Sequence, residues 1–164
     1  MSLFVVTSGG SMTNLNERRT PSRNGTLTGT THRVGTILIS LERRQVPLTN
    51  GAEFWHRIGT NRWVNETAGS PSTGGVVYNM VPTTKLNSPQ RLTVAPNGML
   101  KAVNVRRGPG TSFDVARHAS IGSTVTTTHR SDAPNTLNHN LFPPNTSRWV
   151  RVGEREWMHR DLLR

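Results

Sequence analysis

The chain contains no cysteine, one tyrosine and nine acidic residues among 164 residues. The lack of cysteine excludes disulfide bonds, thiolate metal sites and a cysteine nucleophile. Aromatic residues make up only 5% of the chain, which argues against a base-stacking surface for single-stranded nucleic acid. No apolar run is long enough to cross a membrane, and residues 1–7 lack the basic start of a signal peptide. We therefore expect synthesis in the cytoplasm without a signal peptide, and no membrane span.

The scarcity of acidic residues leaves a formal net charge of +11, carried by 20 lysines and arginines. Arginine supplies nearly all of this charge, and both halves of the chain share it. Such a charge favours polyanionic partners, such as nucleic acid, anionic wall polymers or the acidic face of a protein. Alternatively, the arginines serve solubility and ion pairing. Composition leaves these two interpretations open.

The four tryptophans mark an internal repeat. Residues 55–64 and 149–158 share Trp, Arg, an aliphatic residue, Gly, Trp and an apolar residue in the same order and spacing. Upstream, residues 15–21 align with residues 103–109. A repeat of this kind divides the chain into two structural units. Each unit has a size near the lower limit for independent folding, so we expect packing or a partner to add stability.

Short runs rich in β-branched residues and bounded by Gly, Pro, Asn and Ser predict an all-β fold. The clearest are residues 3–7, 35–41, 124–128 and 149–152. The tryptophan blocks predict hairpins, the second with its turn at residues 153–155. In that register Arg151 faces Trp157, as Arg57 faces Trp63, and each pair predicts a cation–π contact worth about 0.5–1 kcal/mol.

Two segments outside the repeat contain exposed apolar residues. Residues 66–75 are rich in Gly, Ser and Thr, and an apolar run that contains Tyr78 follows at residues 76–82. This run is either an extra edge strand that closes one unit or a strand that adds to a neighbouring chain. The first interpretation is favoured, because an uncovered apolar strand aggregates. The irregular segment 131–147 contains the second apolar element, Leu141 and Phe142.

The second copy carries a series of motifs in a recognisable order. They are Asn-Val-Arg-Arg-Gly-Pro-Gly-Thr-Ser-Phe at residues 104–113, Gly-Ser-Thr-Val at 122–125, Trp-Val-Arg-Val at 149–152 and Glu-Trp-Met-His at 156–159. This series resembles the bacterial SH3-like (SH3b) domain over residues 91–164. The first copy is more divergent, because Thr20 and Ser22 stand where the motif has glycine. We therefore expect any groove beside this loop to be better developed in the second copy.

The resemblance implies an all-β protein made of two small SH3-like β-barrels in tandem. The barrels would span residues 1–70 and 91–164, joined by a Gly/Ser/Pro-rich connector at residues 71–90 with a possible strand at 76–82. It also implies a groove beside the glycine-containing loop that binds cell-wall peptidoglycan or similar peptides. The candidate partner-binding residues are Arg106, Arg107, Thr111, Ser112, Phe113, Trp149, Arg151, Trp157, Tyr78 and Phe142.

Catalytic motifs are missing. The chain has no His-Glu-x-x-His sequence, no Gly-x-Ser-x-Gly elbow and no phosphate-cradling loop. Asp114 and Asp161 are isolated carboxylates, whereas acid–base hydrolysis needs two that face each other. His56 and His159 fall on predicted strands, where a structural role is favoured over metal ligation. We therefore expect a protein that is not an enzyme and that uses no metal or cofactor.

Two functions of different classes fit these features. The favoured one is a structural adaptor that acts through protein–protein contacts in a larger assembly, such as the capsid decoration, tail or baseplate of a bacteriophage virion. It is favoured because the chain lacks the catalytic domain or secretion signal that accompanies wall-binding tandems. The alternative is a binding module for peptidoglycan or anionic wall polymers, released to the wall by lysis. Nucleic-acid binding is less favoured, because it rests on charge alone.

Overall fold

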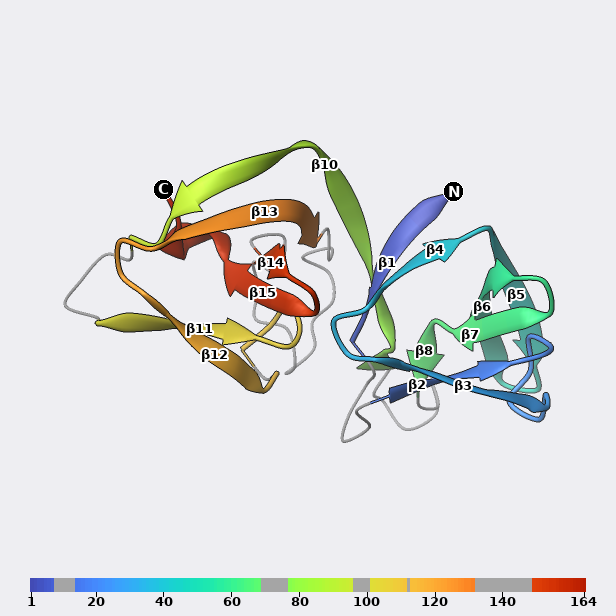
Figure 1. The fold of residues 1–164 in the computed structure, drawn as a ribbon. Coiled ribbons are helices and arrows are strands. Elements are labelled where there is room, and N and C mark those ends of the chain that lie inside the picture. The colour runs from blue at the N-terminus through green and yellow to red at the C-terminus, as the bar shows by residue number, and fades with distance from the viewer. Residues whose placement is uncertain (8–13, 69–76, 96–100, 112, 132–148) are drawn as a thin grey trace. The chain divides into compact units, whose positions relative to one another are not determined.

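The computed structural model describes residues 1–7, 14–68, 77–95, 101–111, 113–131 and 149–164 (Figure 1). These residues form β-strands and one short 3₁₀ helix, so the predicted all-β class is confirmed. Within these ranges, no helix combines the length and apolar character needed to span a membrane. The chain divides into unit 1, Met1–Val81, and unit 2, Pro82–Arg164.

The strands of unit 1 are β1 (Ser2–Val6), β2 (Asn14–Arg18), β3 (Leu27–Arg33), β4 (Ile37–Ser40), β5 (Glu42–Leu48), β6 (Gly51–Gly59), β7 (Arg62–Asn65), β8 (Thr67–Ala68) and β9 (Val77–Tyr78). Strand β10 (Met80–Thr93) begins in unit 1 and continues into unit 2. The other elements of unit 2 are β11 (Ala102–Arg106), β12 (Val115–Ser120), β13 (Thr124–Ser131), β14 (Trp149–Gly153), β15 (Glu156–His159) and the 3₁₀ helix η3 (Arg160–Leu162).

The two units repeat one pattern of antiparallel pairing. Strand β1 pairs with β4 as the end of β10 pairs with the start of β13. The pairs β2–β3 and β6–β7 correspond to β11–β12 and β14–β15. Strand β5 follows β4 and pairs with β6, as the second half of β13 pairs with β14. The repeat in the sequence is therefore also a repeat of structure.

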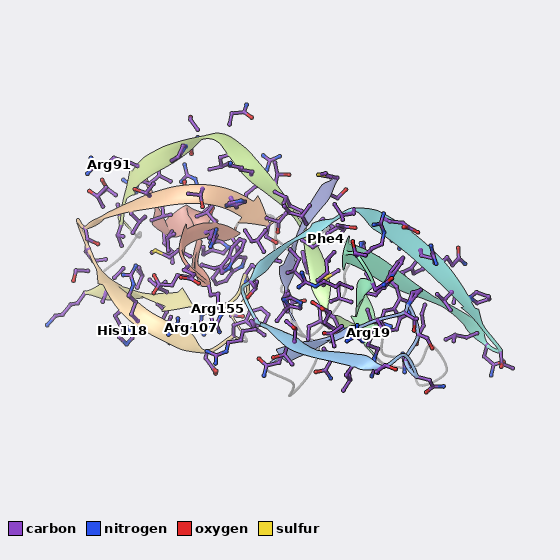
Figure 2. The ribbon with its side chains drawn as sticks, turned by 45° about the vertical axis from the view of Figure 1, so that its right-hand side comes forward. Phe4, Arg19, Arg91, Arg107, His118 and Arg155 are labelled. Atoms are coloured by element: carbon purple, nitrogen blue, oxygen red, sulfur yellow. The ribbon has the colours of Figure 1, made fainter. Side chains whose placement is uncertain are left out.

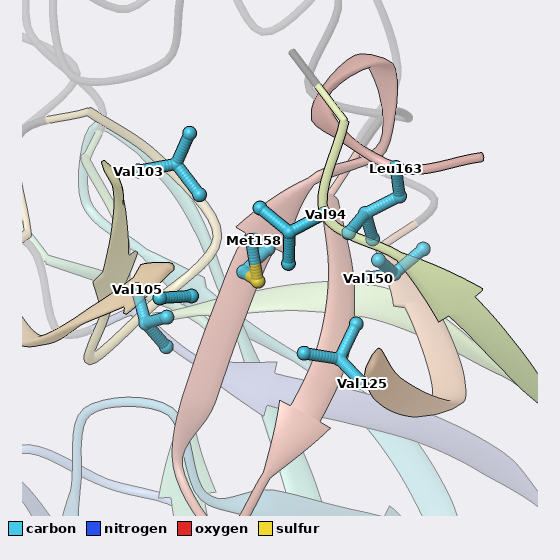
Figure 3. Packing of buried hydrophobic residues seen from close by; sticks show 8 residues of the cluster. Val94, Val103, Val105, Val125, Val150, Met158 and Leu163 are labelled. Carbon is cyan, nitrogen blue, oxygen red and sulfur yellow. The ribbon is translucent and has the colours of Figure 1, made fainter. Parts of the chain in front are cut away.

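Each unit buries a cluster of apolar side chains from its strands. In β11, Val103 and Val105 are buried while Asn104 between them is exposed, as the alternation of a half-buried strand requires. They join a cluster that Figure 3 shows from close by, formed with Val94, Ala119, Val125, Val150, Met158 and Leu163. The corresponding cluster of unit 1 contains Val6, Leu15, Val64 and Met80. Burial of such side chains stabilises a fold by roughly 1.5–3 kcal/mol each.

The tryptophan hairpins have the predicted pairing but a shorter turn. Arg151 faces Trp157 and Arg57 faces Trp63, so both predicted cross-strand pairs are confirmed. The expected three-residue turn at residues 153–155 is wrong, because Gly153 pairs with Glu156 and a bulge follows Arg151. The bulge absorbs one residue and keeps the pairing in register. The turn needs a left-handed residue, which is Arg155 with φ 52°, and the equivalent Asn61 has the same angle.

Unit 1 extends beyond residue 70 because its closing segment comes late in the sequence. Asn79 accepts a hydrogen bond from the backbone of Thr7, and Met80 and Val81 are buried. In the apolar run, β9 pairs with β8 of the same unit as a separate two-stranded sheet, and not as an edge strand of a larger sheet. Past Val81, β10 pairs with β13 from Thr83 onward, so most of the expected connector 71–90 that the structure describes is strand.

A buried polar network lies at the edge of the unit 1 core. His56 is 1% exposed, with its Nδ1 2.7 Å from Ser40 Oγ and its Nε2 2.8 Å from the Glu66 carboxylate. The ring of Phe4, which Figure 2 labels, packs on the His56 ring with 4.3 Å between the two centroids. Burial alone would raise the pKa of Glu66, but hydrogen bonds from His56 and Arg43 outweigh it and lower the pKa to about 2.

This network predicts an acid-sensitive contribution to the stability of unit 1. The pKa of Glu66 is lower in the folded state than the ordinary value of 4.5. Its contribution is therefore complete above about pH 4.5 and is lost as the pH falls through about 2. We expect Glu66→Gln to lower the free energy of unfolding of unit 1 by about 2–3 kcal/mol at neutral pH. Urea unfolding followed by amide NMR signals of unit 1 measures this loss.

The matched control is Glu42→Gln, because Glu42 also accepts from two arginines but lies at 34% side-chain exposure. Its substitution should cost less than that of Glu66 at neutral pH. Equal losses for the two variants, or a loss for Glu66→Gln that persists at pH 2, would contradict the assignment.

Candidate ligand-binding pocket

The loop between β11 and β12 is held together by its own side chains. Arg106 Nη1 donates to the carbonyl of Phe113 at 2.7 Å, and the backbone N–H of Arg107 donates to the carbonyl of Asp114 at 2.9 Å. The Phe113 ring packs against Gly108, where a Cβ atom would lie 2.8 Å from Phe113 Cγ. Gly108 is therefore required for contact with Phe113 of the same loop, and its φ is not positive.

The loop of unit 1 has the equivalent hydrogen bonds to backbone carbonyls despite its different sequence. Arg18 Nη1 donates to the carbonyl of Gly25 at 2.6 Å, and Arg19 N donates to Thr26 at 2.9 Å. Thr20 stands in the place of Gly108, and Gly25 stands in the place of Phe113, so the small and large residues are exchanged. Any side chain at Gly25 would collide with Thr20. The replacement of glycine by Thr20 therefore leaves the loop hydrogen bonds unchanged.

A pocket of about 370 Å³ opens beside the loop of unit 2. It is lined by Ala102, Val103, Asn104, Arg106, Thr111, Trp149, His159 and Leu162. Trp149 and His159 are cross-strand partners, and their rings meet edge to face at 5.5 Å between centroids. The pocket thus combines two aromatic rings with an amide, a hydroxyl and a guanidinium. Such a mixture of apolar walls and few polar groups is typical of ligand sites.

Some of the predicted binding residues line the pocket and others do not. Arg106, Thr111 and Trp149 line the pocket. Trp157 is fully buried, and its indole N–H has no hydrogen-bond partner among the residues that the structure describes. Arg151 lies across from Trp157, on the strand pair that also carries Trp149.

Arg107, Phe113 and Tyr78 are not among the described residues that line the pocket. Phe113 packs on Gly108, and Arg107 is part of the same loop. Tyr78 lies in β9 of unit 1, paired with Thr67. Ser112 and Phe142 lie outside the described residues, as does the rest of the irregular segment after Ser131.

Sequence reasoning missed two polar residues of the pocket. His159 was expected to be structural, yet it lines the pocket opposite Trp149. Asn104 is the exposed residue between the buried Val103 and Val105 of β11. Strand alternation marks Asn104 as outward-facing, and the hairpin register places His159 beside Trp149, so both signals were present in the sequence.

In unit 1 the residue equivalent to Thr111 forms an ion pair. Arg23 occupies the place of Thr111 and pairs with Glu53, a carboxylate whose side chain is 4% exposed. Glu53 also accepts from the Trp55 indole at 3.1 Å and from Asn65, which takes the place of His159, at 3.4 Å. Unit 2 has the small Thr111 in the place of Arg23.

The predicted cation–π partner of Trp63 is wrong. Arg57 faces Trp63, but its Nε donates to Glu42 at 2.8 Å. The guanidinium over the Trp63 ring belongs to Arg44, with Cζ 4.7 Å from the ring centroid. Cross-strand position alone did not reveal that Glu42 competes for Arg57.

The hydrogen-bonded series Ser40, His56 and Glu66 has the residue types of a hydrolytic triad. Ser40 and His56 are 6% and 1% exposed, so their reacting atoms are buried. Both ring nitrogens of His56 have partners within unit 1, and its structural role stays a prediction. Among the described residues, no three His, Asp or Glu side chains cluster as metal ligands.

Comparison with known proteins finds no matching family and no matching curated protein. Among solved structures, the chain is similar to the crystal structure of Ly7917, with a TM-score of 0.32 and 12% sequence identity. The similarity covers 95% of this chain and 60% of that chain. The chain thus spans about 60% of the length of the protein that it matches.

The exchanged loop residues predict strong coupling between positions 108 and 113. We expect Gly108→Thr to destabilise unit 2 by about 1–3 kcal/mol, because the new side chain collides with the Phe113 ring. The double variant Gly108→Thr/Phe113→Gly reproduces the Thr20/Gly25 pair and should recover stability relative to Gly108→Thr. A double-mutant cycle by urea unfolding should show a coupling of about 1 kcal/mol or more. Additive costs would show that the two loops do not share this packing.

Proposed function

We propose that the chain is a non-enzymatic binding protein of two SH3b-like barrels, in which unit 2 recognises short peptides of the bacterial cell wall. The observation that supports this most is the pocket beside the unit 2 loop, together with the ion pair that fills the same place in unit 1. The proposal departs from the adaptor function favoured by the sequence, because an open pocket in one repeat and a filled one in the other suit ligand recognition.

The chemistry of the pocket suits a peptide. Trp149 and His159 offer ring faces and edges on which an extended chain can pack. Asn104 can both donate to and accept from a peptide group, and Thr111 adds a hydroxyl. Arg106 is held in place by its bond to the Phe113 carbonyl, so it can meet a ligand without losing its order. A pocket of about 370 Å³ holds a few residues of such a chain.

Unit 1 supports a second function, that of an adaptor in a larger assembly such as a virion. Its surface exposes the apolar side chains Leu27, Ile39, Leu41 and Leu48, between 41% and 51% of their full area. Exposed apolar groups of this kind suit protein contacts. Unit 1 would then attach the chain to a protein partner while unit 2 binds its ligand.

The proposal predicts that filling the pocket abolishes binding to cell walls. Thr111→Arg places in unit 2 the residue that fills unit 1 at Arg23. Since Thr111 is exposed, the change should leave the fold intact. We expect the parent protein to sediment with insoluble bacterial cell walls at low and high salt, and Thr111→Arg to lose this binding at high salt by roughly tenfold or more.

The matched control is Thr126→Arg, which adds the same charge at an exposed site of β13 outside the pocket. It should bind walls as the parent does. Loss of binding in both variants, or in neither, would contradict a role for the pocket. Binding of the parent that disappears at high salt would show charge attraction alone.

A further inference from the structure

Unit 2 carries a row of basic side chains across neighbouring strands. Lys85 on β10 faces His129 on β13, and His129 faces Arg151 on β14. The row continues through Trp157 on β15 to Arg106 on β11. Residues directly opposite each other in antiparallel strands have Cβ atoms about 4.5–5.5 Å apart on the same face of the sheet. Lys85, His129 and Arg151 therefore lie on the same face of the sheet.

The electrostatics of the row are unfavourable in the free protein. Burial lowers the pKa of His129, and the positive charges of Arg151 and Lys85 lower it further. No carboxylate takes part in the row, as far as the described strands show. Arg151 and Lys85 thus each disfavour a positive charge at the position between them. An anion bound between these groups would relieve this repulsion.

In unit 1, the residue that corresponds to His129 is a glutamate, whose negative charge balances the positive charge of the arginines beside it. Glu42 faces Arg57 as His129 faces Arg151. The Glu42 carboxylate accepts from Arg57 Nε and from Arg44, each at 2.8 Å at the shortest. Unit 2 has an imidazole in place of this carboxylate and adds Lys85 on the next strand. The structural repeat therefore provides an internal reference for a row in which the described residues supply no carboxylate.

We propose that Lys85, His129 and Arg151 form a binding site for an oxyanion with about two negative charges, for which a phosphate group is the fitting chemistry. Arg151 offers guanidinium N–H donors, and its Nε is already anchored to the carbonyl of Gly153 at 3.1 Å. Lys85 offers an exposed ammonium group, and His129 supplies an N–H donor from its ring. These three residues do not line the Trp149 pocket, so the inference does not rest on the proposed function.

The test uses inorganic pyrophosphate and phosphate as probes at constant ionic strength, with the imidazole NMR signals of His129 as the readout. We expect pyrophosphate to shift these signals saturably and to move the pKa of His129 upward, because a bound anion favours the imidazolium. Phosphate should act in the same way but more weakly. Succinate, a dicarboxylate of similar charge, is the arm that separates phosphate chemistry from carboxylate chemistry.

Two variants and one control localise the site. Lys85→Gln should weaken pyrophosphate binding roughly tenfold. His129→Glu should abolish binding while the fold is kept, because it recreates the Glu42–Arg57 pair of unit 1 beside Arg151. The control is Arg91→Gln, which removes an exposed charge from the same strand outside the row (Figure 2). Its affinity should equal that of the parent.

Three results would overturn the proposal. They are the absence of saturable shifts at His129, equal weakening by Lys85→Gln and Arg91→Gln, and unchanged binding in a folded His129→Glu variant. Tighter binding of succinate than of pyrophosphate would overturn the assignment of phosphate. The binding of cell walls through the pocket can fail or succeed independently of each result.

Discussion

A tryptophan held between two arginines across three strands is the contact on which both units depend. Trp157 faces Arg151 on one side and Arg106 on the other. In unit 1, Trp63 faces the equivalent residues Arg57 and Arg18. A slip of one residue would turn the tryptophan to the opposite face. The arginine of β2 or β11 also reaches a carbonyl of the adjacent loop. The register of the hairpin therefore fixes the position of the loop between β11 and β12. This loop and Trp149 form part of the pocket wall.

Within this common frame the two units use charge differently. Each of the four glutamates of unit 1, Glu17, Glu42, Glu53 and Glu66, pairs with at least one arginine. Hydrogen bonds, chiefly from Arg62, lower the pKa of Glu17 to about 2, so that this buried carboxylate stays ionised. In unit 2, Thr111 and His129 replace a paired arginine and a paired glutamate. Ion pairing thus explains much of the basic charge of unit 1, while unit 2 keeps an open pocket and a cationic row.

The sequence predicts those features that depend on spacing along the chain. The tryptophan repeat and the β-branched runs predict the all-β fold and the pairing of Arg151 with Trp157, because strand alternation and register are local rules. The sequence does not predict the packing of Phe113 on Gly108, because it depends on a contact across the loop. The same holds for the Arg23–Glu53 pair, which joins distant parts of unit 1. The sequence also does not predict that unit 1 ends at Val81, because the closing segment follows an insertion that breaks the repeat.

If unit 2 is open to a ligand and unit 1 is closed by its own side chains, as we propose, the two units will respond differently to a ligand. The four tryptophan indole N–H groups, two in each unit, report on this directly in a proton–nitrogen NMR spectrum of the labelled chain. On addition of soluble cell-wall peptides, we expect a saturable shift of the Trp149 signal and no shift of the Trp55 signal. Shifts of both signals together, or of Trp55 alone, would contradict it.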